Sequence, residues 1–88
     1  MRVEAYRLAQ RSLADLKTAV LMILEAEGKQ GLRNVDIGRA LGIYSGHKGH
    51  EGHIPRTLLA MMAGEGLVHQ DEKSRMWFLS PGAENPVE

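Results

Sequence analysis

The chain has 88 residues, and its 11 lysines and arginines balance its 11 aspartates and glutamates, so its formal net charge is zero. This length allows one domain, and the absence of cysteine excludes a disulfide framework, a thiolate nucleophile and a thiolate metal ligand. No apolar run approaches the roughly 18 residues of a membrane span, and the N-terminus lacks the apolar core of a signal peptide. We therefore expect a soluble cytoplasmic protein with no membrane partner.

The segment from residue 13 to residue 28 carries the clearest helical pattern. Its apolar side chains recur at three- and four-residue intervals, which places them on one face of a helix. They are Leu13, Leu16, Val20, Ile23 and Leu24. Gly28 is a natural end, because glycine readily adopts the backbone conformations that close a helix.

The start of this helix has two interpretations. Ser12 followed by Asp15 resembles a capping box, which favours a start at Ser12. Tyr6 and Ala9 extend the apolar stripe backwards, which favours a start near Val3.

The longer helix would overhang so small a domain and would have little to pack against except a second copy. We therefore expect a homodimer in which residues 1–11 form a helical dimerisation extension. Residues 1–80 are expected to form one domain, and residues 81–88 lack periodicity and are expected to be a flexible tail.

A second, shorter helix is predicted from Asn34 or Val35 to Leu41, with Asn34 as its N-cap. Before it, residues 28–31 read as a loop, and Leu32-Arg33 fits a short extended strand. After it, the chain is too polar and too rich in glycine for a regular element until residue 53.

A third helix is predicted over residues 53–63, because Pro55 suits a first helical turn and glycines follow at positions 64 and 66. Its apolar residues are expected to share one buried face. They are Ile54, Leu58, Met61 and Met62.

A β-hairpin is predicted at the end of the domain. Leu67–Gln70 and Met76–Leu79 favour strands, and Asp71–Arg75 forms a charged five-residue turn between them. Trp77 and Phe78 point to opposite sides of their strand, so one of them is expected to be in the core. We expect Trp77 to be partly buried, and the alternative is that it supports a dimer or ligand surface.

This order of elements resembles the winged helix-turn-helix domain over residues 13–79. The resemblance is strongest where Ile54-Pro55-Arg56-Thr57-Leu58-Leu59 is followed by Gly66-Leu67-Val68 and the charged hairpin. It implies an α+β fold of three helices plus a C-terminal two-stranded wing. It also implies a DNA-binding transcription regulator, in which two copies would present their helices to half-sites about one turn apart. The loop before the third helix is longer than the ~3–4 residues of a usual helix-turn-helix turn.

The resemblance also implies roles for individual residues. The third helix would enter the major groove of double-stranded DNA with the residues that point away from its apolar face. Those base readers are His53, Arg56 and Thr57, and Arg56 fits best because a guanidinium pairs bidentately with guanine. The phosphate backbone would be held by His47, Lys48, His50 and Arg39, and the wing would add Lys73 and Arg75.

The loop of residues 45–52 has three interpretations. Its glycines and Lys48 suit contact with phosphates, and its polar composition also suits a solvated loop. In the third interpretation, His47, His50 and His53 bind a metal with Glu51, as in a metal-responsive regulator. If the imidazoles face phosphates, DNA affinity should rise as the pH falls through ~6.5.

Charge is unevenly distributed along the chain. Residues 29–58 carry a net charge of +3 and residues 59–88 a net charge of −3, so the positive part coincides with the expected DNA-reading unit. The zero total charge favours the alternative of a protein-interaction module with the same fold. No catalytic constellation or phosphate-binding glycine motif is evident, so we expect neither an enzyme nor a cofactor.

Overall fold

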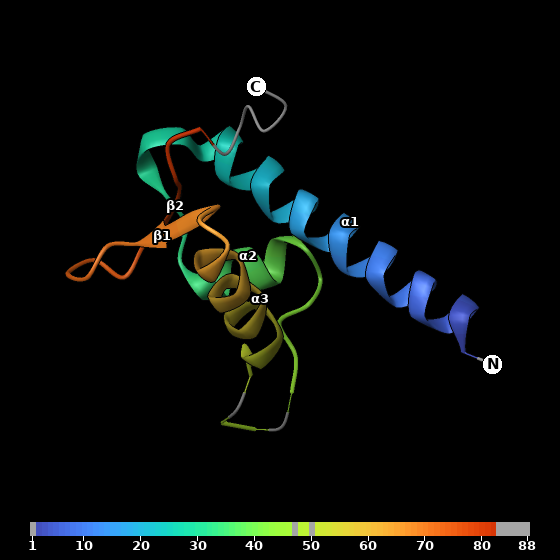
Figure 1. Ribbon diagram of the computed structural model, residues 1–88. Coiled ribbons are helices and arrows are strands. Elements are labelled where there is room, and N and C mark those ends of the chain that lie inside the picture. The colour runs from blue at the N-terminus through green and yellow to red at the C-terminus, as the bar shows by residue number, and fades with distance from the viewer. Residues whose placement is uncertain (1, 47, 50, 83–88) are drawn as a thin grey trace.

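A computed structural model describes residues 2–46, 48–49 and 51–82 of the chain (Figure 1). The elements run α1 (Val3–Glu27), η1 (Gly28–Gln30), α2 (Asn34–Ala40), α3 (His53–Gly64), β1 (Val68–Gln70) and β2 (Trp77–Leu79). This order confirms the predicted α+β class with three helices and a two-stranded antiparallel sheet. In the part of the chain that the structure describes, no helix is both long and apolar enough to cross a membrane.

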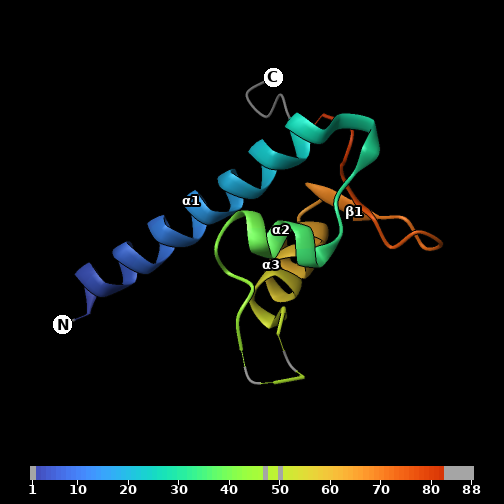
Figure 2. The same cartoon turned by 180° about the vertical axis from the view of Figure 1, so that it is seen from behind.

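Helix α1 takes the longer of its two predicted forms, because it begins at Val3 and encloses Ser12. Its C-terminal half packs on the domain through Val20 and Leu24, which are buried. Its N-terminal half extends beyond the rest of the molecule in both views (Figures 1 and 2), and every residue from 3 to 12 is exposed. Gly28 ends the helix with a positive φ, and its N–H donates to the Leu24 carbonyl.

Helix α2 begins at Asn34, so the prediction that Asn34 is the N-cap was wrong. Arg33 takes that position, and its N–H donates to Asp36 Oδ2 at 3.1 Å. The Asn34 side chain instead donates through Nδ2 to the Gly52 carbonyl at 3.3 Å. This bond ties the start of α2 to the start of α3 across the intervening loop.

Helix α3 buries a different face from the predicted one. Pro55, Leu58, Leu59 and Met62 are buried, whereas Ile54 and Met61 remain 46% and 40% exposed. The prediction that Ile54 and Met61 belong to the core was therefore wrong. Apolar residues occupy two adjoining sides of α3, and periodicity alone does not distinguish the side that meets the core from its neighbour.

The two strands pair antiparallel with Val68 opposite Leu79 and Gln70 opposite Trp77. The predicted third strand reduces to one bridge, in which Leu32 and Trp77 exchange backbone hydrogen bonds of 3.1 and 2.7 Å. Trp77 is buried, more fully than the predicted partial burial, and Phe78 on the other face is half-buried.

The core lies between the C-terminal half of α1, α2, α3 and the inner face of the hairpin. Its hydrophobic members are Val20, Leu24, Ile37, Leu58, Leu59, Met62, Val68 and Trp77. Burying a large aliphatic or aromatic side chain contributes roughly 1.5–3 kcal/mol. This burial fixes α3 against the sheet. The residues of α3 on the opposite side and on its two flanks remain accessible.

Candidate nucleic-acid interface

A groove with three arginines lies where the start of α2, the first turns of α3 and the hairpin meet. Its volume is about 400 Å³. The lining residues are Arg33, Asn34, Val35, Tyr44, Arg56, Gln70, Ser74, Arg75 and Trp77. None of these side chains is a carboxylate, so the lining has a positive formal charge although the whole chain is neutral. We call this surface the basic groove.

Arg56 reaches the basic groove from the first turn of α3. Its side chain is exposed, and it forms no salt bridge with a described residue. The backbone beside it is closely packed, because a Cβ added to Gly52 would lie 2.8 Å from Tyr44 and 2.9 Å from Asn34. Gly52 also has a φ of +91°, which favours glycine. The floor of the groove is therefore a tight junction between the loop and α2.

Asn34 contributes an open acceptor to this junction. Its Nδ2 is used by Gly52, and its Oδ1 is buried with no hydrogen-bond partner among the described residues. A buried acceptor without a donor is costly, so a donor at this position would be favoured.

The hairpin turn places Arg75 over the basic groove. Asp71 Oδ2 accepts the Ser74 N–H at 2.7 Å, and the Arg75 N–H donates to the Asp71 carbonyl at 2.8 Å. The Ser74 hydrogen bond is the main reason that the pKa of Asp71 lies below its ordinary range. Gln70 Nε2 closes the turn by donating to the Arg75 carbonyl at 3.0 Å.

Arg75 has a φ of 67°, and among described residues other than glycine it is the one with a positive φ. A side chain in this conformation costs roughly 1–2 kcal/mol relative to glycine. Such positions often carry function, since strain persists where the surrounding structure imposes it. An arginine therefore stands in the groove at a position where glycine would be easier to accommodate.

Arg33 differs from the other two arginines because it has a partner. Its Nε and Nη2 donate to Asp36 Oδ2 and Oδ1, both at 3.0 Å. This bidentate pair is the main cause that raises the pKa of Arg33 and lowers the pKa of Asp36. Asp36 thus offsets part of the positive charge at this end of the groove.

The outward side of α3 carries His53, Thr57 and Ala60, all exposed and opposite the core. A rotation of about 100° per residue puts Arg56 on one flank of this side and Ile54 with Met61 on the other. The predicted base readers are thus accessible, but they belong to two different grooves. Arg56 lines the basic groove, whereas His53 and Thr57 border an apolar groove that also includes Ile54 and Met61. The prediction that His53 and Thr57 lie apart from that apolar face was wrong.

Lys48 and Arg39, both predicted to hold phosphates, do not line the basic groove. Lys48 is exposed, and Arg39 stacks on Tyr44 with its guanidinium 5.3 Å from the ring centroid. His47 and His50 lie outside the described residues. Among the residues that are described, no three histidine or acidic side chains gather as metal ligands.

Sequence reasoning missed Arg33, Asn34, Tyr44 and Gln70 as parts of this surface. Arg33 had a local signal, because an acidic residue follows it three positions later. The other three are brought to Arg56 only by the packing of α2 and the hairpin around α3. Lys73, also predicted to contact DNA, is exposed in the hairpin turn next to the groove.

Comparison with known proteins gives no match: no family model, no curated protein and no solved structure is similar to this chain.

Proposed function

We propose that this protein is a winged helix-turn-helix regulator that binds double-stranded DNA. The outward side of α3 enters the major groove with Ala60 towards the bases, beside the apolar groove that His53 and Thr57 border. Arg56 reads a base edge or holds a phosphate beside it, and Arg75 and Lys73 contact the neighbouring backbone from the hairpin.

The observation that carries this proposal is the basic groove. A neutral chain gathers Arg33, Arg56 and Arg75 around one concave surface, and none of the described residues that line it is acidic. Guanidinium groups suit phosphates and guanine edges because their donors form a planar fork. The small residues Thr57 and Ala60 leave the outward side of α3 free of bulk that would hold it away from the bases.

The test is fluorescence anisotropy of a labelled mixed-sequence duplex titrated with the full chain at several salt concentrations. The dissociation constant should be micromolar or lower at low salt. The logarithm of the association constant should fall linearly with the logarithm of the salt concentration, with a slope of roughly −0.9 per phosphate contacted. Arg75→Ala should lower that slope by about one. Arg11→Ala is the control, because Arg11 is an exposed cation on the side of α1 opposite the buried Val20 and Leu24. If the protein did not bind the duplex even at low salt, the proposed DNA binding would be wrong.

A protein-interaction module is the second candidate. It is favoured by the zero net charge and by the apolar surface at Ile54 and Met61, which a purely DNA-binding helix does not need. The same titration distinguishes the two functions, because a protein-interaction module has no salt-dependent affinity for a duplex.

A further inference from the structure

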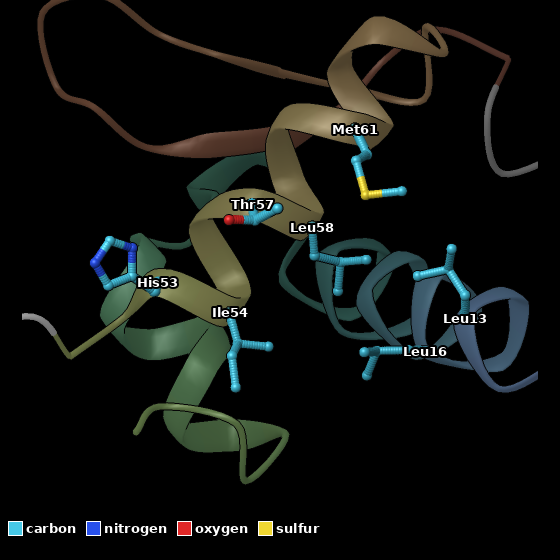
Figure 3. Close-up of a pocket in the computed structure, with 7 residues that line it drawn as sticks. All are labelled: Leu13, Leu16, His53, Ile54, Thr57, Leu58 and Met61. Atoms are coloured by element: carbon cyan, nitrogen blue, oxygen red, sulfur yellow. The ribbon is translucent and has the colours of Figure 1, made fainter. Parts of the chain in front are cut away.

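A second, apolar groove lies between α1 and α3 and shares no lining residue with the basic groove. Figure 3 shows Leu13 and Leu16 of α1 facing Ile54, Leu58 and Met61 of α3 across it. Its volume is about 320 Å³. Lys17 Nζ lies 2.7 Å from Glu65 Oε2 and ties α1 to the turn after α3. We call this surface the apolar groove.

The overhang of α1, residues 3–12, continues the same helix face beyond the domain. Tyr6 and Ala9 follow the three- and four-residue spacing of Leu13 and Leu16, so they lie on the α1 face that lines the apolar groove. Tyr6 is 67% exposed. Terminal helical turns that make no tertiary contact are only marginally stable. Packing against a partner would stabilise the overhang as a helix.

The charges of the overhang lie on its other side. They recur at three- and four-residue intervals, which is one stripe of a helix. They are Glu4, Arg7 and Arg11, and Asp15 continues the stripe beyond the overhang. This stripe is about 120–180° from Leu13 around the helix, and the apolar face is bordered by the uncharged Ala5, Gln10 and Ser12. The overhang is amphipathic, and in the described part of the chain nothing covers its apolar side.

We infer that a second copy of this chain covers both surfaces, with the two α1 helices antiparallel and the overhang of each copy lying over the apolar groove of the other. In an antiparallel pair centred on residue 11, Tyr6 lies opposite Leu16 of the second copy and Ala9 lies opposite Leu13. One patch is then used twice, as a two-fold axis requires. This inference goes beyond the proposed DNA binding and holds whether or not DNA binds.

The exposed area suits a dimer. Val3, Tyr6, Ile54 and Met61 each leave between 40% and 67% of their surface exposed. From two copies, these side chains supply on the order of 600 Å² of apolar surface, about half of the ~1,200 Å² at which stable interfaces begin. The inferred dimer requires the remainder from the intervening residues of the helix pair. A foreign helix could fill the groove, but it would leave the overhang uncovered, whereas a second copy covers both.

Sedimentation equilibrium of the full chain without DNA tests the inference. A dimer of twice 9.7 kDa should form at micromolar concentration. Tyr6→Glu should weaken it at least about 100-fold, because a charge would be buried against Leu16. Met22→Glu is the matched control, since Met22 is 64% exposed on the opposite side of α1 and should leave the dimer unchanged. Both positions are exposed, so circular dichroism should show that both variants fold.

The register is tested by cross-linking, which the absence of cysteine makes simple. In the inferred dimer, the two residues at position 9 are about 6 Å apart along the helix axis, and those at position 22 are about 33 Å apart. Ala9→Cys should therefore cross-link with a short bismaleimide, and Met22→Cys should not. A chain that remains monomeric at 200 µM would overturn the inference, as would a dimer indifferent to Tyr6→Glu or one that links through position 22. A monomer whose groove binds an added amphipathic helical peptide would also overturn it, in favour of a foreign partner.

Discussion

The two flanks of α3 differ in chemistry although they belong to one helix of 12 residues. On the hairpin side, Arg56 joins two other arginines in a groove without carboxylates. On the α1 side, Ile54 and Met61 face leucines in a groove with almost no polar atoms. The buried side between the flanks holds both in place. The comparison teaches that a single short helix can present an anion-binding surface and a protein-binding surface that can be disturbed independently.

The largest expected effect separates the two flanks directly. Arg56→Glu should lower duplex affinity roughly 100-fold at low salt, because it removes a donor fork and adds a repelling charge. The dimer dissociation constant should not change, since Arg56 does not line the apolar groove. Anisotropy measures the first quantity and sedimentation equilibrium the second. Arg11→Glu is the control, because it makes the same charge reversal at an exposed residue of α1. Equal losses for both variants would mean that net charge, and not the basic groove, determines binding.

Gly52→Ala should have the next largest effect, by disturbing the floor of the basic groove alone. The new Cβ would meet Tyr44 and Asn34 at under 3 Å and would also sit at a positive φ. We expect a loss of about 2–3 kcal/mol in the free energy of unfolding. Gly49→Ala is the control, because Gly49 has a φ of +85° but no described residue has an atom within 4 Å of an added Cβ, so it should lose only about 1 kcal/mol. Urea denaturation measures both, and identical losses would show that the close contact contributes nothing.

A smaller effect is expected at the hairpin, where stability and binding should change in opposite directions. Arg75→Gly should raise the free energy of unfolding by about 0.5 kcal/mol, since glycine adopts a φ of 67° without strain. It should lower duplex affinity several-fold through the lost guanidinium. Arg75→Ala should show the same loss of affinity without the gain in stability. If Arg75→Gly bound DNA as well as the original chain does, the hairpin would not belong to the interface.

The smallest effect concerns the Arg33–Asp36 pair at the end of the basic groove. Hydrogen bonding to Arg33 lowers the pKa of Asp36 in the folded chain. A lowered carboxyl pKa stabilises the fold above the unfolded value of about 3.9, and this stabilisation is lost as the pH falls through the lower folded value. Asp36→Asn should therefore lower the melting temperature by a few degrees at pH 7, and the difference should shrink as the pH falls below the unfolded pKa of Asp36. A difference that does not change with pH would assign the effect to the amide's geometry and not to the charge.

The order and type of the elements follow from local signals in the chain. The three-four spacing of the apolar residues in α1, the glycine at its end, Pro55 at the start of α3 and the strand-forming pair Trp77-Phe78 are local signals. Local signals suffice for such features, because helix and strand periods are properties of neighbouring residues. The longer of the two forms of α1 was also visible as a continued stripe through Tyr6 and Ala9.

Which apolar residues are buried, and which polar residues meet, depends on packing between elements. Ile54 and Leu59 are both apolar residues of α3, but Leu59 is fully buried in the core while Ile54 is exposed in the groove between α3 and α1. Asn34, Gln70 and Arg56 are far apart in sequence and converge because α2 and the hairpin pack on the same helix. A helical stripe defines a direction around an axis, and the neighbour that lies in that direction is set by packing across the whole chain.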